Sequence, residues 1–379
     1  MDEEKIYDAA IVGGGLAGLS LSILLSREGY DVILFEKESY PFHKVCGEYI
    51  SAESRPFLKS LGLPLDTMDL PAITKLIVTS PGGYQLNQNL PLGGFGISRY
   101  KIDHALRDIA SGYRVRVMES CKVENVSFSH ETFYIHTPKG TFKSRICCGA
   151  FGKRSNLDVK WNRPFVYQKP NKLNNYIGVK YHIKSDFPAD TIALHNFENG
   201  YCGISKIEDD KYCLCYLTTA FNLNRSGNSI SRMETEILSG NIHLKKIFES
   251  STRIFSQPLS ISRISFEHKP RVEQHILMAG DAAGMITPLC GNGMSMALHG
   301  ATIASVHIID FLKGKINRAE LENKYVDEWN KTFAGRLRAG RILQRFFGKP
   351  WLTELFIRAM KLSPFFTRKL IQQTHGKPF

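Results

Sequence analysis

Short apolar segments alternate with polar turns at the start of the chain. Residues 7–12 (YDAAIV) form an apolar run that predicts a buried strand. Residues 19–29 (LSLSILLSREG) place apolar side chains at helical spacing, and residues 31–36 (DVILFE) predict a second strand that ends in Glu36. The order strand, helix, strand predicts the first unit of an α/β domain.

Later segments have a different periodicity. Residues 122–137 and the run from about Tyr176 to Thr219 alternate in the manner of strands, which predicts antiparallel sheet: a small meander first, then the floor of a second domain. From Asn330 the apolar spacing is helical again, with a further helix after Pro350 and a turn at Pro364. The chain is therefore expected to end in helices.

A glycine motif joins the first strand to the first helix. Gly13, Gly15 and Gly18 form G-x-G-x-x-G, with Leu16 and Ala17 at the predicted helix start. The first glycine permits a tight turn, the second lets the backbone approach a pyrophosphate, and the third lets the helix close on the strand. Glu36 then stands where it can accept a hydrogen bond from a ribose 2′-hydroxyl. The pattern predicts FAD or NAD, rather than NADP, in this first site.

A second motif lies far along the chain, in residues 276–300 (ILMAGDAAGMITPLCGNGMSMALHG). An apolar strand leads to Gly280 and Asp281, and Gly291, Gly293 and Met294 open a helix. An acid at a strand end can bind a hydroxylated chain, and a glycine-lined helix start can face an electron-rich ring edge. The two motifs together resemble the FAD-dependent oxidoreductase superfamily of group A flavin monooxygenases, halogenases and geranylgeranyl reductases, and are most similar to the geranylgeranyl reductase-like branch.

The resemblance implies a Rossmann-like FAD-binding domain of the glutathione reductase and p-hydroxybenzoate hydroxylase type, with an antiparallel-sheet substrate domain and C-terminal helices. It implies that Asp281 holds the ribityl or pyrophosphate region and that the helix after Gly291 faces the isoalloxazine. The expected parts are a discontinuous FAD domain (1–72, 98–160 and 270–330), a substrate domain (73–97 and 161–269) and a basic helical region (331–379).

Three further positions acquire roles from the resemblance. Arg99, in the segment ISRYKIDHALRDIA, is expected to contact the cofactor, and Val123, expected in a strand, to lie over the adenine. Cys46-Gly47-Glu48-Tyr-Ile-Ser resembles the C-G-E loop of archaeal geranylgeranyl reductases, which places Cys46 and Gly47 along the flavin. A thiol there can serve as the proton donor or only line the ring. Outside the resemblance, a cysteine is most often a small buried hydrophobe.

The chain also departs from the family. Phe151 replaces the acid of the G-A-D-G motif, which weakens docking of NADPH in the hydroxylase manner, although Lys153 and Arg154 remain available for phosphates. Tyr201 alone remains of the aromatic segment that lines a prenyl tunnel, so it marks a reshaped substrate cavity. The W-x-W-x-I-P motif of halogenases is absent, and Lys75 is weak support for a tunnel lysine.

These features predict an FAD enzyme that acts on an isoprenoid-, lipid- or polyketide-like substrate, reducing a C=C bond by flavin hydride. The alternative is a monooxygenase that hydroxylates an aromatic or polyketide substrate through a flavin hydroperoxide, and a non-catalytic flavin- or lipid-binding protein is a third hypothesis. The external electron donor, NAD(P)H or a ferredoxin-like protein, stays open.

Composition narrows the setting. The 379 residues are 43% hydrophobic and 22% charged, an ordinary globular balance. The acidic start is unlike a secretory signal and no long uninterrupted apolar run occurs, which predicts a cytoplasmic protein without a transmembrane helix. The eight cysteines have no metal-binding spacing, so no metal is expected.

The net charge of +13 is concentrated near the end of the chain, because residues 331–379 contain eleven Lys and Arg against one acid. Lys331, Arg338, Arg341 and Arg345 fall on one side of a predicted helix. This side is either a solvated basic face or a peripheral contact with anionic lipid on the inner face of the membrane. No nucleic-acid-binding motif accompanies the charge.

Overall fold

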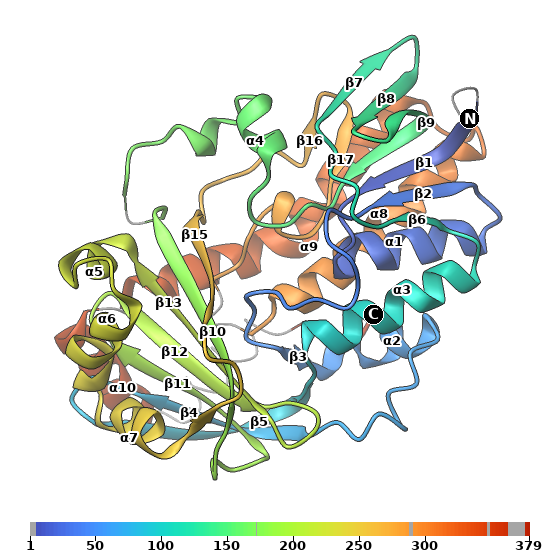
Figure 1. Ribbon diagram of the computed structural model, residues 1–379. Helices are drawn as coiled ribbons and strands as arrows, with labels where there is room; N and C mark the ends of the chain where they lie inside the picture. Colours follow the sequence, from blue (N-terminus) through green and yellow to red (C-terminus); the bar gives the residue numbers. More distant parts are fainter. Residues whose placement is uncertain (1–4, 172, 288–290, 347–348, 363–375) are drawn as a thin grey trace.

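A computed structural model describes residues 5–171, 173–287, 291–346, 349–362 and 376–379. Two β-sheets stand side by side, and helices cover both (Figure 1). Strands of the first sheet come from residues 6–149 and 272–278, whereas those of the second sheet come from residues 49–96 and 176–264.

The first sheet has the strand order β16-β17-β9-β1-β2-β6. Its central strands pair in parallel, β1 with both β2 and β9, as the expected α/β unit requires. A β7–β8 hairpin pairs with β9 and forms the expected meander. The strands are β1 (Ile6–Val12), β2 (Val32–Phe35), β6 (Arg116–Met118), β7 (Asn125–Ser129), β8 (Thr132–Thr137), β9 (Gly140–Gly149), β16 (Val272–Glu273) and β17 (Ile276–Met278).

The second sheet has the order β14-β10-β13-β12-β11-β4-β5-β3, with β15 also on β10. Its pairs are antiparallel as expected, except that β4 and β11 run parallel. The strands are β3 (Tyr49–Ser51), β4 (Ala72–Thr79), β5 (Gln85–Gly96), β10 (Tyr176–Lys184), β11 (Thr191–Phe197), β12 (Gly200–Lys206), β13 (Tyr212–Thr219), β14 (Thr252–Arg253) and β15 (Leu259–Ile264).

Helices divide between the two sheets. Beside the first sheet lie α1 (Leu16–Arg27), α2 (Arg55–Ser60), α3 (Arg99–Gly112), α4 (Asn156–Lys160), α8 (Gly293–Leu312) and α9 (Arg318–Phe346). The second sheet carries α5 (Ala220–Arg225), α6 (Ile230–Glu236), α7 (Ile242–Ser250) and α10 (Pro350–Leu362).

The two faces of the second sheet pack against different helices, because side chains alternate along each strand. On the outer face, Val179 and Tyr216 pack with Met233 of α6 and Leu244 of α7. On the inner face, Leu217 and its neighbours pack with α10. The inner face is also the one whose strand β10 reaches the first domain through Lys180 and His182.

Helix α9 corrects the expected boundary between residues 330 and 331. It begins at Arg318 and continues through that point without a break. Trp329, Phe333 and Leu337 are buried at a spacing of four, so one stripe of the helix stays on the core as far as Leu337. The turn expected at Pro364 and the side chain of Arg345 lie outside the described residues.

Helix α8 is the one helix in the described parts of the chain that is long and apolar enough to cross a membrane by those measures alone. More than half of its apolar window is buried inside the structure. Leu298, Ala301, Ile303 and Ile308 belong to the main core, so α8 has the burial of a core helix.

Candidate functional site

The glycine turn between β1 and α1 is shaped by close backbone contacts. Gly13 has φ +111°, and a Cβ there would lie 2.5 Å from the Ala150 carbonyl oxygen. A Cβ on Gly18 would overlap the Gly13 carbonyl, so this glycine lets the helix close on the strand as expected. Gly15 is the N-cap of α1 and has no side chain, so the first N–H groups of Leu16 and Ala17 stay directed at a ligand.

Two cations lie over this turn. A Cβ on Gly15 would lie 3.3 Å from Arg99 Nη2 and 3.8 Å from Lys44 Nζ. Arg99 pairs with Asp103 through Nε to Oδ1 at 2.9 Å and Nη2 to Oδ2 at 2.7 Å, and Lys44 Nζ lies 3.0 Å from the same carboxylate. Burial alone would raise the pKa of Asp103, but the charges of Arg99 and Lys44 have the larger, opposite effect. The pKa of this carboxyl is therefore lowered overall.

Glu36 follows β2 and is buried beside the turn. Its Oε2 accepts the Gly14 N–H at 3.0 Å, and its Oε1 accepts the Glu38 N–H at 3.2 Å. Lys44 Nζ lies 3.6 Å from Oε2. The carboxylate is thus held at the turn, and its bond to a ribose stays a prediction. The sequence-based prediction gave Lys44 no role at the phosphates, and the structure places it beside Gly15.

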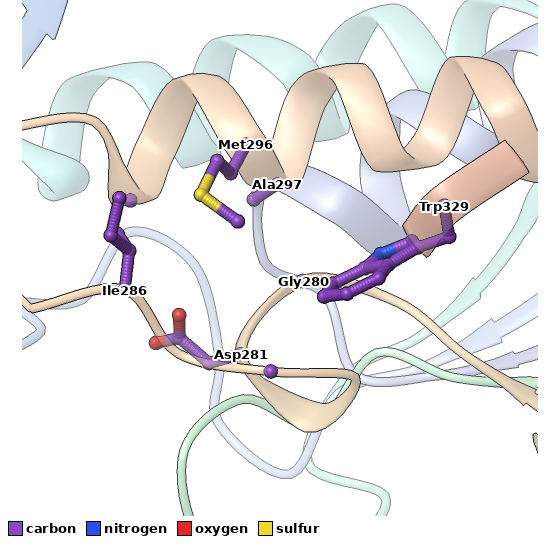
Figure 2. Close-up of a pocket in the computed structure, with 8 residues that line it drawn as sticks. Gly280, Asp281, Ile286, Met296, Ala297 and Trp329 are labelled. Atoms are coloured by element: carbon purple, nitrogen blue, oxygen red, sulfur yellow. The ribbon is translucent and has the colours of Figure 1, made fainter. Parts of the chain in front are cut away.

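The second motif meets the first at the start of α1. A Cβ on Gly280, which has φ +60°, would lie 3.2 Å from the Ala17 Cβ. Figure 2 shows Asp281, half-buried in the 3₁₀ turn η4 (Gly280–Ala282), facing a pocket that Met296 of α8 also lines. Gly293 and Trp329 also line this pocket. The structure therefore brings the two predicted glycine motifs together.

Two buried hydroxyl groups lie near the start of α8. Met294 is buried, and a Cβ on Gly291 (φ +64°) would lie 3.1 Å from the Tyr49 ring. Tyr49 Oη and Ser295 Oγ are buried and lack a hydrogen-bond partner among the described residues. Unpaired buried hydroxyls fit a ligand with polar edges. Together with the open N–H groups, the two cations and Asp281, these residues fit FAD.

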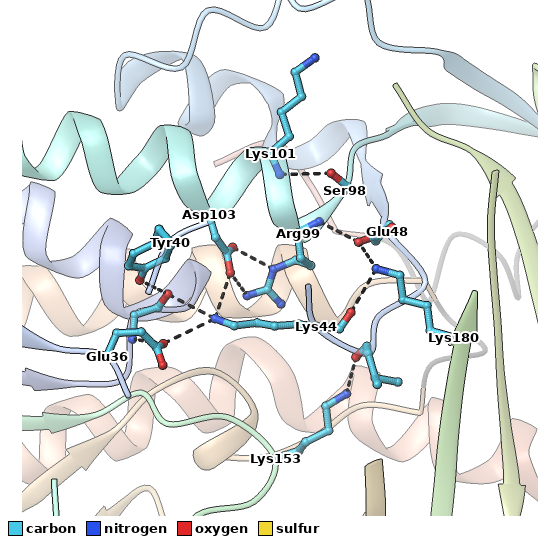
Figure 3. A network of polar contacts seen from close by, with 12 residues as sticks. Glu36, Tyr40, Lys44, Glu48, Ser98, Arg99, Lys101, Asp103, Lys153 and Lys180 are labelled. Carbon is cyan, nitrogen blue, oxygen red and sulfur yellow. Dashed lines mark hydrogen bonds and ion pairs between the residues drawn. The ribbon is translucent and has the colours of Figure 1, made fainter. Parts of the chain in front are cut away.

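The Cys46 loop is held in place by its backbone. Three successive carbonyl oxygens accept hydrogen bonds from distant segments. Lys44 O accepts from Lys180 Nζ at 3.2 Å (Figure 3). Val45 O accepts from Lys153 Nζ at 3.0 Å, and Cys46 O from Cys213 Sγ at 3.2 Å. The Cys46 side chain itself is half-buried and Gly47 is exposed. Lys153 therefore anchors this loop, which corrects its expected availability for phosphates.

Glu48 is the charged centre of the anchor. The Glu48 backbone has φ +56°, and its carboxylate is fully buried. The carboxylate accepts hydrogen bonds from the Lys180 ammonium, from the Arg99 N–H at 2.8 Å and from His182 Nε2 at 2.6 Å. Burial would raise the pKa of Glu48, but Lys180 and then His182 lower it overall. Burial would lower the pKa of Lys180, and Glu48 raises it overall. In the sequence, Glu48 stands in the C-G-E motif without an assigned role, and no local pattern marks Lys180 or His182.

Glu48, His182 and Cys213 place potential metal ligands within 4.8 Å of one another. Two features favour the ion pair over a metal. The Lys180 ammonium already neutralises the Glu48 carboxylate. Burial also raises the pKa of the Cys213 thiol well above its usual value, which disfavours the thiolate that a metal binds.

Two other predicted positions have clear places. Tyr201 is buried on the inner face of the second sheet with Leu194, Leu217 and Met285. Val123 is buried just before β7, so it lies in a loop and not in the expected strand, and its carbonyl accepts Asn156 Nδ2 at 3.2 Å. Its contact with adenine stays a prediction.

Comparisons with known proteins agree with this fold. The model of the NAD(P)-binding Rossmann-like domain matches residues 11–45. Conditioned medium factor receptor 1 of Dictyostelium discoideum is 23% identical over 359 residues, covering 88% of this chain and 69% of that protein. Digeranylgeranylglycerophospholipid reductase of Methanococcus vannielii is 24% identical over 349 residues, covering 86% and 83%. The structure of the flavin-dependent brominase Bmp2 superposes with a TM-score of 0.79 at 20% identity, covering 98% and 93%.

Proposed function

We propose that the chain is an FAD-dependent oxidoreductase that reduces a carbon–carbon double bond of a hydrophobic substrate, which its similarity to a Rossmann-like domain, to flavin-dependent halogenases and to a geranylgeranyl lipid reductase supports. FAD, when bound, supplies the hydride for this chemistry, and NAD(P)H or a ferredoxin-like protein supplies its electrons. The open N–H groups of α1, with Lys44 and Arg99, hold the pyrophosphate. Glu36 accepts from the adenosine ribose.

The Cys46 loop is the single observation that carries the proposal. Its backbone is anchored at three carbonyls, so the half-buried thiol is presented from a fixed position. Reduction of an alkene adds a hydride at one carbon and a proton at the other. The Cys46 thiol gives that proton, and the resulting thiolate regains one from water.

The inner face of the second sheet supports a hydrophobic substrate. Near the Cys46 loop its side chains are small: a Cβ on Gly203 would have its nearest neighbour at 3.6 Å, and Cys215 is half-buried. Farther along, the face is apolar: its buried residues Val78, Leu86, Leu194, Tyr201 and Leu217 form one cluster with Met285, which follows η4. A mostly apolar wall with one polar end suits an apolar chain that carries one reacting group.

Halogenation lacks comparable support. Lys75 is largely exposed and pairs with Asp190 at 2.7 Å, so it lies on the surface and not at the inner face. Trp161 and Trp329 belong to the core of the first domain. Trp351 lies on the solvent side of α10.

A single-turnover experiment without oxygen tests the function. The holoenzyme is photoreduced and mixed with an unsaturated isoprenoid glycerolipid dispersed in detergent. We expect the flavin to reoxidise and the lipid to gain two hydrogens per double bond. If the flavin stays reduced until oxygen is admitted and the product gains an oxygen atom, the enzyme is a monooxygenase. If the lipid never changes the flavin redox state with or without oxygen, the proposal also fails.

Replacing Glu36 by alanine should weaken FAD binding about 10–100-fold, because a hydrogen bond to a charged group contributes about 1.5–3 kcal/mol. Flavin absorbance per protein after dialysis measures the loss, and titration of the apoprotein with FAD measures the affinity. Glu38→Ala is the matched control, since Glu38 is half-exposed two residues away. Full retention of FAD by a folded Glu36→Ala protein would remove Glu36 from the site.

A further inference from the structure

Helix α10 has two apolar faces on opposite sides. Thr353, Ile357 and Met360 are buried against the second sheet. Trp351, Leu355 and Leu362 are 67%, 57% and 87% exposed. At 100° per residue these three side chains fall within one narrow sector of the helix. A helix that only covers a sheet needs one apolar face, so the second one calls for a partner.

The buried face of α10 forms part of the apolar wall. Ile357 and Met360 share one cluster with Leu86, Tyr201 and Leu217 of the inner sheet face. A crevice between α10 and β5, lined by Gln85–Gln88, Met360 and Lys361, opens at the edge of this contact. Helix α10 therefore packs on the apolar wall with one side and exposes an apolar face on its other side.

The charge around the exposed face is net positive. Lys349, Arg358 and Lys361 are exposed on or beside α10. The one acid after residue 330, Glu354, is neutralised by Arg358 at 3.0 Å. On α9, Arg338 and Ile342 repeat the pairing of an exposed cation with an exposed apolar residue one turn away.

We propose that the α10 surface (Trp351, Leu355, Leu362, Lys349, Arg358 and Lys361) seats the protein on an anionic phospholipid bilayer. The role of this contact rests on the proposed function, because the contact places the crevice where an apolar substrate leaves the bilayer. Tryptophan and leucine flanked by cations are the residues of interfacial helices. Lysines are depleted from the cores of protein interfaces, so a bilayer suits this composition better than a protein partner.

Vesicle sedimentation tests the surface without turnover. The holoenzyme should bind phosphatidylcholine vesicles that contain phosphatidylglycerol, and it should not bind vesicles made only of phosphatidylcholine. Added salt should weaken the binding. Trp351→Ser/Leu355→Ser and Lys349→Glu/Lys361→Glu should each lose about tenfold or more in affinity. Phe221→Ser, at an exposed phenylalanine of α5, and Lys245→Glu of α7 are matched controls that should bind normally.

Trp351 also serves as an internal reporter. Trp161 and Trp329 are 9% and 2% exposed, so a blue shift of tryptophan emission on binding anionic vesicles should come from Trp351 and vanish in Trp351→Phe. Equal binding to neutral vesicles, or binding that no α10 variant changes, would overturn the proposal. So would a dimer in solution that Trp351→Ser/Leu355→Ser dissolves, because the occupant is then a second copy.

The two proposals fail separately. If the function is wrong but the surface is right, vesicles bind and the anaerobic lipid assay shows no reduction. If the surface is wrong, the Lys349→Glu/Lys361→Glu variant binds vesicles as the wild type does, while lipid dispersed in detergent is still reduced.

Discussion

Replacing Cys46 with serine is expected to slow reoxidation of the reduced flavin by an alkene substrate about 10²–10⁴-fold, the usual contribution of a general acid. A hydroxyl is a much weaker acid than a thiol, while its size is similar. Reduction of the flavin by its electron donor should change far less, because that step does not use this proton. Stopped-flow absorbance measures both half-reactions separately.

The matched control for this variant is Cys202→Ala, which removes a buried thiol on the outer side of the second sheet. It should leave both half-reactions unchanged. FAD content and circular dichroism of Cys46→Ser should match the wild type, since the loop is anchored through backbone carbonyls. Wild-type alkene reduction by Cys46→Ser would make Cys46 a packing residue and remove the main support for a reductase.

Lys180→Met is expected to destabilise the fold by about 3–5 kcal/mol, because it leaves the Glu48 carboxylate buried beside one fewer cation. Urea unfolding measures the loss. Lys180→Met/Glu48→Gln should recover part of it, since the second change removes the unpaired charge. Lys184→Met, at an exposed lysine on the same strand, is the control. A double variant less stable than Lys180→Met would contradict this account.

The same cluster predicts a pH dependence. In the wild type the pKa of Glu48 is lowered in the folded state, so its contribution is present at neutral pH and is lost as pH falls through that lowered value. In Lys180→Met, burial acts with less compensation and raises the folded pKa. The unfolding free energies of the two proteins should therefore differ most near neutral pH and converge as the variant's carboxyl becomes protonated.

Local pattern was sufficient for much of the fold. The apolar run before Gly13, the glycine spacing and the strand ending at Glu36 each depend on neighbours within a few residues, and all three are present. The strand alternation from Tyr176 to Thr219 likewise predicted β10–β13. The local pattern failed at Val123, which precedes β7, and near Asn330, where Trp329 and Phe333 keep α9 on the core although the change in charge suggested a boundary.

Residues of the candidate site likewise differ in whether local sequence pattern could predict them. Gly280 and Asp281 were found from their motif, since a strand end and a helix start are local features. Glu48 and Lys180 are 132 residues apart, and their pairing exists only because β10 lies against the Cys46 loop. The same is true of Lys153, whose contact with Val45 spans 108 residues. A side chain's sequence neighbourhood does not encode a partner at that separation.

By itself, then, the sequence determined the nucleotide-binding unit, the antiparallel second sheet, the position of Cys46 beside a glycine and the excess of charge after residue 330. The tertiary structure alone decided which groups hold the Cys46 loop, that Val123 lies in a loop, and that α10 has an apolar face on each side. Hydrophobic periodicity and glycine stereochemistry act over one or two turns of chain, whereas ion pairs and the exposure of a face depend on which distant segments pack together.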